Sequence, residues 1–197
     1  MIIGVTGTSG AGKSKISELL KNKLEAVVVD ADKIAKEMSQ KQKAYYDAIV
    51  SFFGIDILRA DEEINRKKLA QMVYEDSAKM QKLNELTNAY VVKEIEEKAL
   101  MLEKERTVIL DVPRLVESGL DNICDFTIAV LADEAVKLER ICARDNVDAE
   151  LAKKRLTIQP KDAFYLENVD YIIKNNGEDL EEQINEWRKI CIKHGKN

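Results

Sequence analysis

Short, nearly continuous apolar runs alternate along the chain with longer stretches in which apolar residues recur at helical spacing. The runs are rich in Val and Ile, as is typical of strands buried on both faces of a sheet. The predicted strands are Ile2–Thr6, Ala26–Asp30, Thr107–Asp111, Phe126–Leu131 and Val169–Ile173. The predicted helices are Lys13–Leu24, Ile34–Met38, Ala44–Phe53, Asn65–Tyr74, about Ala78–Lys104, Glu134–Arg144, Ala149–Leu156 and Leu180–Ile192. Strands separated by helices predict an α/β fold, a five-stranded parallel sheet between helical layers.

One connection is too long for an ordinary crossover between parallel strands. Between Asp30 and Thr107 the pattern is wholly helical, although a simple crossover needs only about a dozen residues. We therefore expect residues 31–106 to form a helical insertion within one domain that spans residues 1–197.

Composition excludes several classes of protein. Of the 197 residues, 45% are hydrophobic and 34% are charged, so a normal core can be buried and wholesale disorder is not expected. The formal net charge of −5 disfavours general binding to nucleic acid or to a membrane surface. No apolar window approaches the length of a membrane-spanning helix, about 18 residues or more.

The cysteines and the N-terminus predict a reducing, cytoplasmic location. Cys124, Cys142 and Cys191 are odd in number and far apart, which does not fit a disulfide framework. Because His194 is the only histidine, a His/Cys zinc site is not expected. The first residues lack the basic segment of a signal peptide.

Half of the eight glycines lie in the first twelve residues, and three of them belong to a phosphate-binding motif. Gly7-Thr8-Ser9-Gly10-Ala11-Gly12-Lys13-Ser14 matches G-x-x-x-x-G-K-S/T between a predicted strand and a predicted helix. Such a loop points successive backbone N–H groups at phosphate oxygens, and the helix that follows adds its positive end. The sequence therefore predicts a nucleoside triphosphate site at this loop.

Side chains of the motif and its surroundings complete the predicted site. Lys13 can reach the β and γ phosphates, and the Ser14 hydroxyl can ligate Mg²⁺. The next residue, Lys15, adds a further cation. Asp111 closes a run of four apolar residues, a Walker B pattern that presents a carboxylate to the same metal ion from a neighbouring strand. The alternative is that Asp111 is only the polar residue at which a strand ends, which would give the same pattern.

The remaining motifs favour a kinase over other P-loop proteins. The D-x-x-G and N-K-x-D motifs of GTPases are absent, and a large ATPase would need a longer chain. Arg140, Arg144 and Arg155 lie on two predicted helices after the fourth strand, where they can neutralise transition-state charge. Surface pairing with Asp145, Asp148 or Glu139 is the alternative for these arginines.

Two further segments fall at the carboxyl edge of the predicted sheet, where ligands bind. In Asp30-Ala31-Asp32, one carboxylate can orient or deprotonate an acceptor hydroxyl, and the other can cap the following helix. We favour Asp32 for the acceptor. Asn175-Asn176-Gly177 predicts a turn with positive φ at Gly177 that can also border a nucleotide base.

Nearly end to end, these residues resemble the dephospho-CoA kinases of coenzyme A biosynthesis. Besides the P-loop and Asp30-Ala31-Asp32, the segments that carry the resemblance are Phe53–Leu58, Asn65–Leu69, Asp111–Glu117, Leu138–Arg140, Arg144-Asp145 and Asp170–Gly177. Some positions depart from the family pattern: Lys15 stands in place of Thr, Glu62 in place of Gly, and Asn88-Ala89 in place of His-Pro, while Arg114 adds a cation.

The resemblance implies transfer of the γ-phosphoryl group of ATP, with Mg²⁺, to the ribose 3′-hydroxyl of dephospho-CoA. It further implies that Asp32 activates the acceptor, that Arg144 lies on the ATP side, and that Asn175 to Gly177 border the adenine. Acceptor binding would fall to the helical insertion, with Asn65 and Arg66, and to the segment from Pro113 to Glu117. Residues 144–166 would form a lid.

Two alternatives remain at this stage. One is a divergent kinase of the same fold that phosphorylates another nucleotide or nucleoside, and the other is a protein that binds nucleotide without turnover. Lys13, Ser14, Asp32 and Asp111 occur together, and a binder without turnover has no chemical need for the acceptor-side carboxylate. We therefore favour an enzyme.

Overall fold

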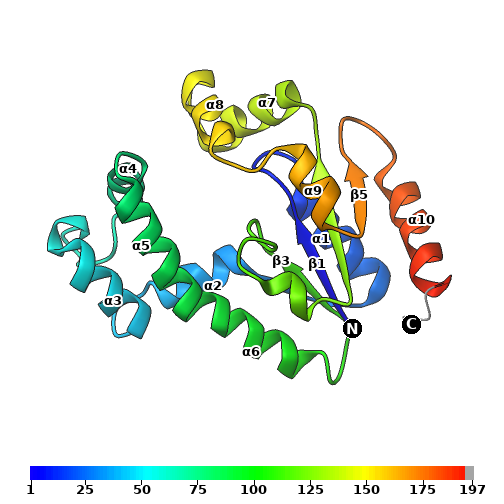
Figure 1. The fold of residues 1–197 in the computed structure, drawn as a ribbon, viewed down its shortest axis with the longest axis horizontal. Coiled ribbons are helices and arrows are strands. Elements are labelled where there is room, and N and C mark those ends of the chain that lie inside the picture. Colours follow the sequence, from blue (N-terminus) through cyan, green and yellow to red (C-terminus); the bar gives the residue numbers. More distant parts are fainter. Residues whose placement is uncertain (194–197) are drawn as a thin grey trace. The chain divides into compact units, whose positions relative to one another are not determined.

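A five-stranded sheet forms the centre of the larger part of the protein (Figure 1). The structure is a computed structural model that describes residues 1–193. The strands are β1 (Ile2–Thr6), β2 (Val27–Asp30), β3 (Val108–Asp111), β4 (Phe126–Leu131) and β5 (Tyr171–Lys174), in the order β2-β3-β1-β4-β5. β1 pairs in parallel with β3 and β4, and β4 pairs in parallel with β5. The α/β fold with a parallel sheet is therefore confirmed.

The chain divides into two compact units. The first comprises Met1–Val29 and the chain from Ala99 onward, and the second comprises Asp30–Lys98. The helices that follow β1, β4 and β5 in the first unit are α1 (Lys13–Leu24), α7 (Glu134–Asp145), α8 (Ala149–Thr157), α9 (Asp162–Asn168) and α10 (Leu180–Lys193).

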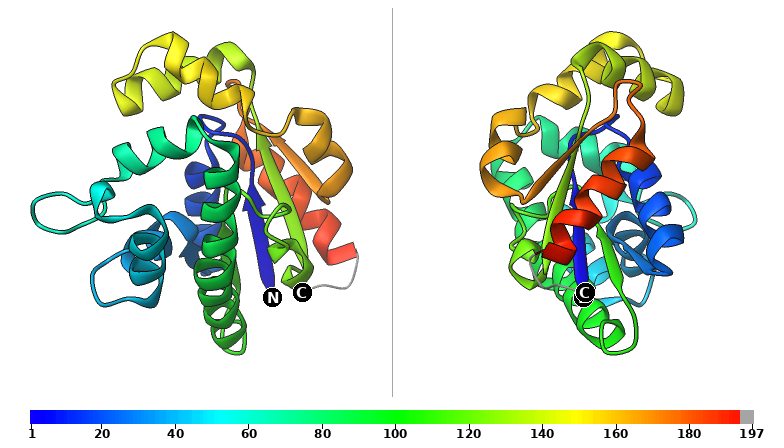
Figure 2. Two further views of the ribbon diagram at one scale, coloured as in Figure 1. Left: turned by 60° about the vertical axis from the view of Figure 1, so that its left-hand side comes forward. Right: turned by 90° about the vertical axis from the view of Figure 1, so that its right-hand side faces the viewer.

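Helices cover both faces of the sheet in the first unit (Figure 2). Val130 of β4 packs with Leu20 of α1 and Trp187 of α10 in one buried cluster. Leu131, the next residue of β4, packs with Tyr165 of α9 in a second cluster. Because side chains alternate along a strand, these two clusters lie on opposite faces, which gives three layers.

The second unit is built almost entirely from helices. Its elements are α2 (Ala31–Met38), α3 (Ala44–Phe53), a 3₁₀ turn (Ile55–Ile57), α4 (Arg66–Tyr74), α5 (Ser77–Thr87), a π-helical turn (Asn88–Val92) and the start of α6 (Lys93–Leu102). The only extended pairing among its described residues is a single antiparallel bridge between Leu58 and Ile64. The predicted long helix from Ala78 to Lys104 is therefore divided at Asn88–Val92 by the π-helical turn.

Two local predictions were wrong for identifiable reasons. Strand β5 begins at Tyr171, two residues later than predicted, because Asp170 N–H donates to the Thr127 side chain instead of the strand ladder. Helix α9 was not predicted at all, since its seven residues are too few to show a helical period.

The structure also bears on predicted absences within residues 1–193. No helix in this range has the length and apolar character needed to cross a bilayer. No three or more His, Cys, Asp or Glu side chains in this range cluster as a metal site. The prediction about His194 concerns a residue outside the described range.

Candidate active site

The loop between β1 and α1 has the backbone that the phosphate-binding motif requires. Gly7, Gly10 and Gly12 have φ values of 132°, 78° and 101°, which residues with a Cβ rarely adopt. A Cβ added at Gly10 would lie 2.6 Å from the carbonyl oxygen of Lys137 on α7. Glycine is therefore needed at Gly10 for both conformation and space.

Several N–H groups of this loop are available to a ligand. Among the described residues, the N–H groups of Gly10, Gly12 and Ser14 have no protein acceptor, whereas Ala11 N–H donates to Thr8 O at 3.2 Å. Gly12 and Ser14 flank the first residue of α1, whose dipole favours an anion at this end. The loop therefore offers unpaired donors in a locally positive field.

The Lys13 ammonium lies over the other end of the loop. Its Nζ donates to the carbonyl oxygens of Gly7, at 2.8 Å, and Thr8, at 3.3 Å. Lys15 and the Ser14 side chain, by contrast, are exposed at the start of α1. Of the two lysines, Lys13 is therefore the one that contacts the loop.

Asp111 and the segment after it lie beside the strand that feeds the loop. Asp111, 8% exposed, is paired with Val5 in the register of β3 and β1. Thr6 donates its hydroxyl to Pro113 O at 3.0 Å. Further along, Glu117 Oε1 lies 3.9 Å from Arg114 Nε, and its buried Oε2 has no hydrogen-bond partner. Burial and the nearby Glu117 carboxylate raise the pKa of the Tyr165 phenol.

Arg140 and Asn175 hold the loop from outside. The Arg140 guanidinium donates to Gly10 O, to Ala11 O and, at 2.9 Å, to Asn175 O. The Asn175 amide, 6% exposed, donates to Ala11 O at 2.7 Å. Two residues predicted to touch nucleotide are thus engaged with the loop backbone. Gly177 has a φ of 123°, which confirms the predicted positive φ.

Arg144 and Arg155 converge on one carboxylate. Arg144 Nε lies 2.7 Å from Asp145 Oδ1, and Arg155 Nη1 lies 2.6 Å from Asp145 Oδ2. The hydrogen bond from Arg144, and then the charges of both arginines, lower the pKa of the Asp145 carboxyl. Arg144 Nη2 also donates to Ser9 Oγ at 3.3 Å, which links this trio to the loop.

Two residues near the loop were not singled out by sequence reasoning. Gln159, which follows α8, accepts a hydrogen bond from Ser9 N–H through its Oε1 at 2.8 Å. Lys137 is only 8% exposed, and its Nζ lies 3.7 Å from Asp162 Oδ1. Neither residue belongs to a short motif, so only the spatial contact could identify it.

The two aspartates after β2 have different surroundings. Asp30 caps α2, since its Oδ1 accepts from Lys33 N–H at 3.0 Å. Asp32 lies in the first turn of α2 and is exposed. Of the two alternatives for this pair, capping thus belongs to Asp30, and the Asp32 carboxylate is left for other contacts.

The predicted acceptor residues of the second unit line a cationic cavity. Asn65 caps α4 by accepting from Lys68 N–H at 3.1 Å. Arg66 donates to Ser39 Oγ at 2.7 Å. Both residues line a cavity of about 450 Å³, which is also bordered by Lys36, Arg59, Lys67 and Glu63. An adjoining cavity of about 280 Å³ is more apolar and is lined mainly by Tyr45, Ile49, Leu69, Val73, Tyr74, Met80 and Leu83.

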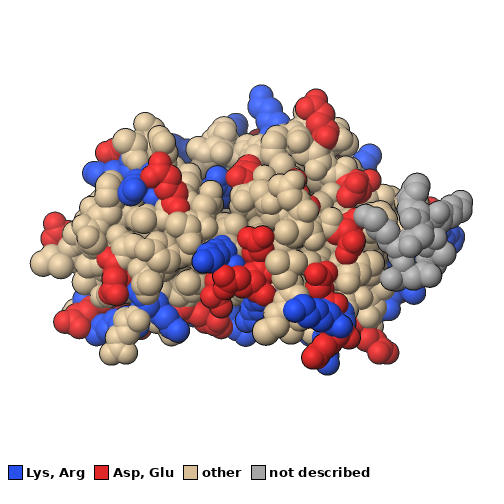
Figure 3. All heavy atoms as spheres, turned by 60° about the horizontal axis from the view of Figure 1, so that its bottom comes forward, with Lys and Arg blue, Asp and Glu red and all other residues tan. Residues whose placement is uncertain are grey.

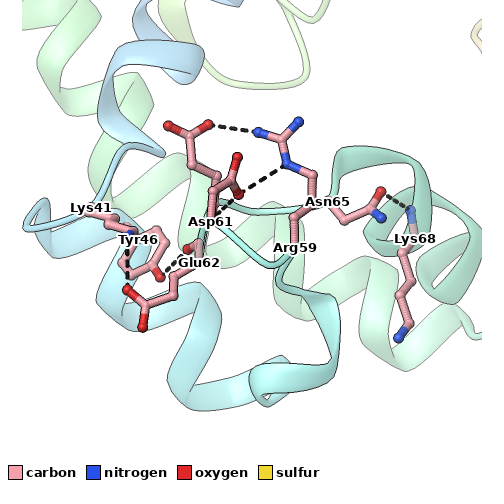
Figure 4. A network of polar contacts seen from close by, with 8 residues as sticks. Lys41, Tyr46, Arg59, Asp61, Glu62, Asn65 and Lys68 are labelled. Carbon is pink, nitrogen blue, oxygen red and sulfur yellow. Dashed lines mark hydrogen bonds and ion pairs between the residues drawn. The ribbon is translucent and has the colours of Figure 1, made fainter.

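A polar network fixes the loop that leads to Asn65 (Figure 4). Glu62 has a φ of 61°, a left-handed conformation that favours Gly, the residue usual in the resembled family. Its carboxylate pairs with Lys41 Nζ at 2.8 Å, and its carbonyl accepts from Tyr46 OH at 2.6 Å. Arg59 Nη2 donates to Glu63 Oε2 at 2.9 Å. These contacts hold the left-handed backbone at Glu62, where the family pattern has Gly.

Comparison with known proteins points to one family. The family model described as Dephospho-CoA kinase matches residues 1–181. A dephospho-CoA kinase of Fusobacterium nucleatum subsp. nucleatum is 39% identical over 194 residues, 97% of this chain and 97% of the relative.

Solved structures give the same picture. A dephospho-CoA kinase from Campylobacter jejuni is 27% identical, with a TM-score of 0.68 and 98% of each chain covered. A shikimate kinase from Bacteroides thetaiotaomicron has a TM-score of 0.56 at 15% identity, covers 97% of this chain and 98% of its own, and shares the fold alone.

Proposed function

The chain belongs to the dephospho-CoA kinase family, and from this premise we propose that it transfers the γ-phosphoryl group of ATP to the ribose 3′-hydroxyl of dephospho-CoA. The family match over residues 1–181 is the observation that carries the proposal. The loop geometry supports it, because unpaired N–H groups and Lys13 are the groups that bind a polyphosphate.

In the proposed reaction, Asp32 accepts the proton of the 3′-hydroxyl. The hydroxyl oxygen bonds to the γ-phosphorus while the bond from that phosphorus to the β,γ-bridging oxygen breaks. ADP leaves with the electron pair of the broken bond. Little covalent help is needed in such a transfer, so positioning and neutralisation of charge by Lys13, Arg144 and the loop N–H groups supply most of the catalysis.

Arg140 and Asn175 contribute by shaping the site. Both side chains donate to Ala11 O, so the N–H of the same peptide, that of Gly12, points the other way, toward the proposed nucleotide. Gly10, Ala11, Gly12 and Lys15 complete the proposed ATP site, and Gly177 borders the base. Residues 144–166 form the proposed lid.

The oxygen donors near the loop fit Mg²⁺. Asp111 offers a carboxylate at the end of β3, and Ser14 offers an exposed hydroxyl at the first turn of α1. Magnesium in such sites takes one or two protein oxygens together with phosphate oxygens, so a larger protein cage is not required. When bound, the ion neutralises charge on the β and γ phosphates.

We assign the acceptor to the predicted helical insertion, residues 31–106, and to the segment from Pro113 to Glu117. The cationic cavity beside Asn65 and Arg66 suits the pyrophosphate of dephospho-CoA, because one Arg guanidinium can donate two parallel hydrogen bonds to phosphate oxygens. We also propose a reducing, cytoplasmic location. All three cysteines are free, as is usual for proteins in a reducing compartment.

A steady-state assay tests this function against its alternatives. ADP release would be measured with MgATP and either dephospho-CoA or a panel of nucleoside monophosphates. We expect turnover with dephospho-CoA. Turnover only with a monophosphate would contradict the acceptor, and no turnover with any acceptor would favour a non-catalytic binder.

A further inference from the structure

The carboxamide of Gln159 sits directly on the phosphate-binding loop. Its Oε1 accepts from Ser9 N–H at 2.8 Å, although the two residues are 150 positions apart in sequence. Gln159 is half-buried. Within the part of the chain that the structure describes, its Nε2 has no hydrogen-bond partner, so the acceptor half of the amide is anchored and its donor half is available.

The anchor lies at the terminal-phosphate end of the loop. Lys13, whose counterpart in such motifs reaches the β and γ phosphates, donates to the carbonyls of Gly7 and Thr8. Ser9 follows these two residues directly. The opposite end of the loop, from Gly12 onward, leads into α1 and serves the inner phosphates.

The groups around this amide are suited to an anion. The nearly buried Lys137 has its carbonyl oxygen against Gly10, and among the described residues its ammonium pairs with Asp162 alone, at 3.7 Å. Arg144 donates to Ser9 Oγ. The Thr8 hydroxyl is buried without a hydrogen-bond partner. A terminal phosphate in this region would meet cations and unpaired polar groups.

We propose that Gln159 binds the terminal phosphate and thereby distinguishes a nucleoside triphosphate from a diphosphate. Oε1 stays on Ser9 N–H, which fixes the plane of the amide, and Nε2 donates to an oxygen of the γ-phosphate. A carboxamide can make both contacts at once, because it carries an acceptor and a donor. The inference rests on the proposed function, in which ATP is the donor.

The test compares Gln159→Glu with the wild-type chain. A carboxylate of the same shape still accepts from Ser9 N–H, but it cannot donate and it repels phosphate. Dissociation constants for ADP and for a non-hydrolysable ATP analogue would be measured by calorimetry with Mg²⁺ and without acceptor. We expect affinity for the analogue to fall about tenfold or more, and affinity for ADP to change less than about threefold.

Two further variants separate the possible causes. Gln159→Met removes both the donor and the acceptor of the amide without adding charge, so its preference for the analogue over ADP should also fall below that of the wild type. Gln42→Glu makes the same charge change at an exposed site in the second unit and should leave both affinities unchanged. Thermal unfolding of each variant checks that the fold is retained.

The possible failures are distinguishable. If Gln159→Glu and Gln159→Met keep the wild-type preference, or lose affinity for both nucleotides in parallel, Gln159 serves only to hold the loop and the inference is overturned. If the wild-type chain binds neither nucleotide, the proposed function falls together with the inference.

Discussion

At the scale of single residues, two cations that contact the loop differ in how firmly they are held. Lys13 contacts two loop carbonyls with a mobile ammonium that phosphate oxygens can attract away. Arg140 is fixed by three backbone carbonyls, two in the loop and one after β5. The mobile Lys13 ammonium is suited to the reacting phosphates, and the fixed Arg140 guanidinium is suited to holding the loop that binds them.

Replacing Lys13 by Ala tests the first role. We expect kcat to fall by about 100-fold or more, because the charge that develops on the transferring phosphoryl group loses its nearest cation. The circular dichroism spectrum and the unfolding midpoint should stay close to those of the wild type. A Lys13→Ala enzyme with near-normal kcat would contradict the assignment.

Replacing Arg140 by Ala tests the second role. The change leaves the carbonyls of Gly10 and Asn175 without their donor, whereas Ala11 O keeps the Asn175 amide. We therefore expect the free energy of unfolding to fall by about 2 kcal/mol and KM for ATP to rise. Chemical denaturation and steady-state kinetics measure the two effects. Arg144→Ala is the matched control: its side chain is 62% exposed, and it should cost less than about 1 kcal/mol. An equal loss of unfolding free energy in Arg140→Ala and Arg144→Ala would contradict the structural role of Arg140.

The sequence predicts residues of a motif better than residues that reach it from afar. Gly7 to Ser14 could be identified because phosphate binding requires these residue types at this spacing. The contacts of Arg140 and Asn175 with the loop could not, since they depend on how α7 and the end of β5 pack beside it. Gln159 was missed for the same reason, as its partner Ser9 lies at the far end of the chain.

At the scale of elements, the start of α2 assigns different tasks to two neighbouring carboxylates. Asp30 caps the helix, and Asp32 is exposed in the first turn. A cap needs only a side-chain oxygen, whereas proton transfer needs a group that can be ionised. Amide substitutions therefore separate the two tasks.

We expect Asp32→Asn to lower kcat by about 100-fold or more with little effect on stability. Asp30→Asn keeps the capping oxygen and should retain most of kcat. Steady-state kinetics on both variants, with melting curves as the check of folding, give the comparison. Equal kcat in Asp32→Asn and wild type would remove Asp32 as the acceptor-activating group.

The ion trio between α7 and α8 predicts a pH effect. The pKa of Asp145 is lowered in the folded chain, so its contribution to stability is present above the ordinary Asp pKa, about 4, and is lost as the pH falls through the folded value. Asp145→Asn should thus be less stable than wild type at pH 7, by under about 1 kcal/mol, and the difference should narrow toward pH 3. Urea unfolding across this range measures it. A difference that grows with falling pH would contradict the sign.

Elements with a strong period were predicted well, and short or interrupted elements were not. β1, β4, α1 and α3 have the predicted bounds, because each is a clear apolar run or a clear helical pattern. The π-helical turn at Asn88–Val92 was not foreseen, since one extra residue in a helix barely changes the spacing of apolar positions.

At the scale of the whole molecule, an acidic chain is proposed to bind polyphosphates. The net charge is −5, and on the face drawn in Figure 3 acidic and basic side chains are interspersed. The cations that matter are local, at the loop of the first unit and around the cavity of the second. The proposed binding therefore depends on the placement of a few cations and not on the overall charge.

The central claim is the transfer of phosphate to a ribose 3′-hydroxyl. The most direct measurement is phosphorus NMR of the product formed from MgATP and dephospho-CoA, with the 3′-deoxy analogue of the acceptor as the control. We predict one new phosphomonoester at the ribose 3′ position and no transfer to the analogue. Phosphorylation of the 3′-deoxy analogue, or ATP consumption without a phosphorylated acceptor, would contradict the account.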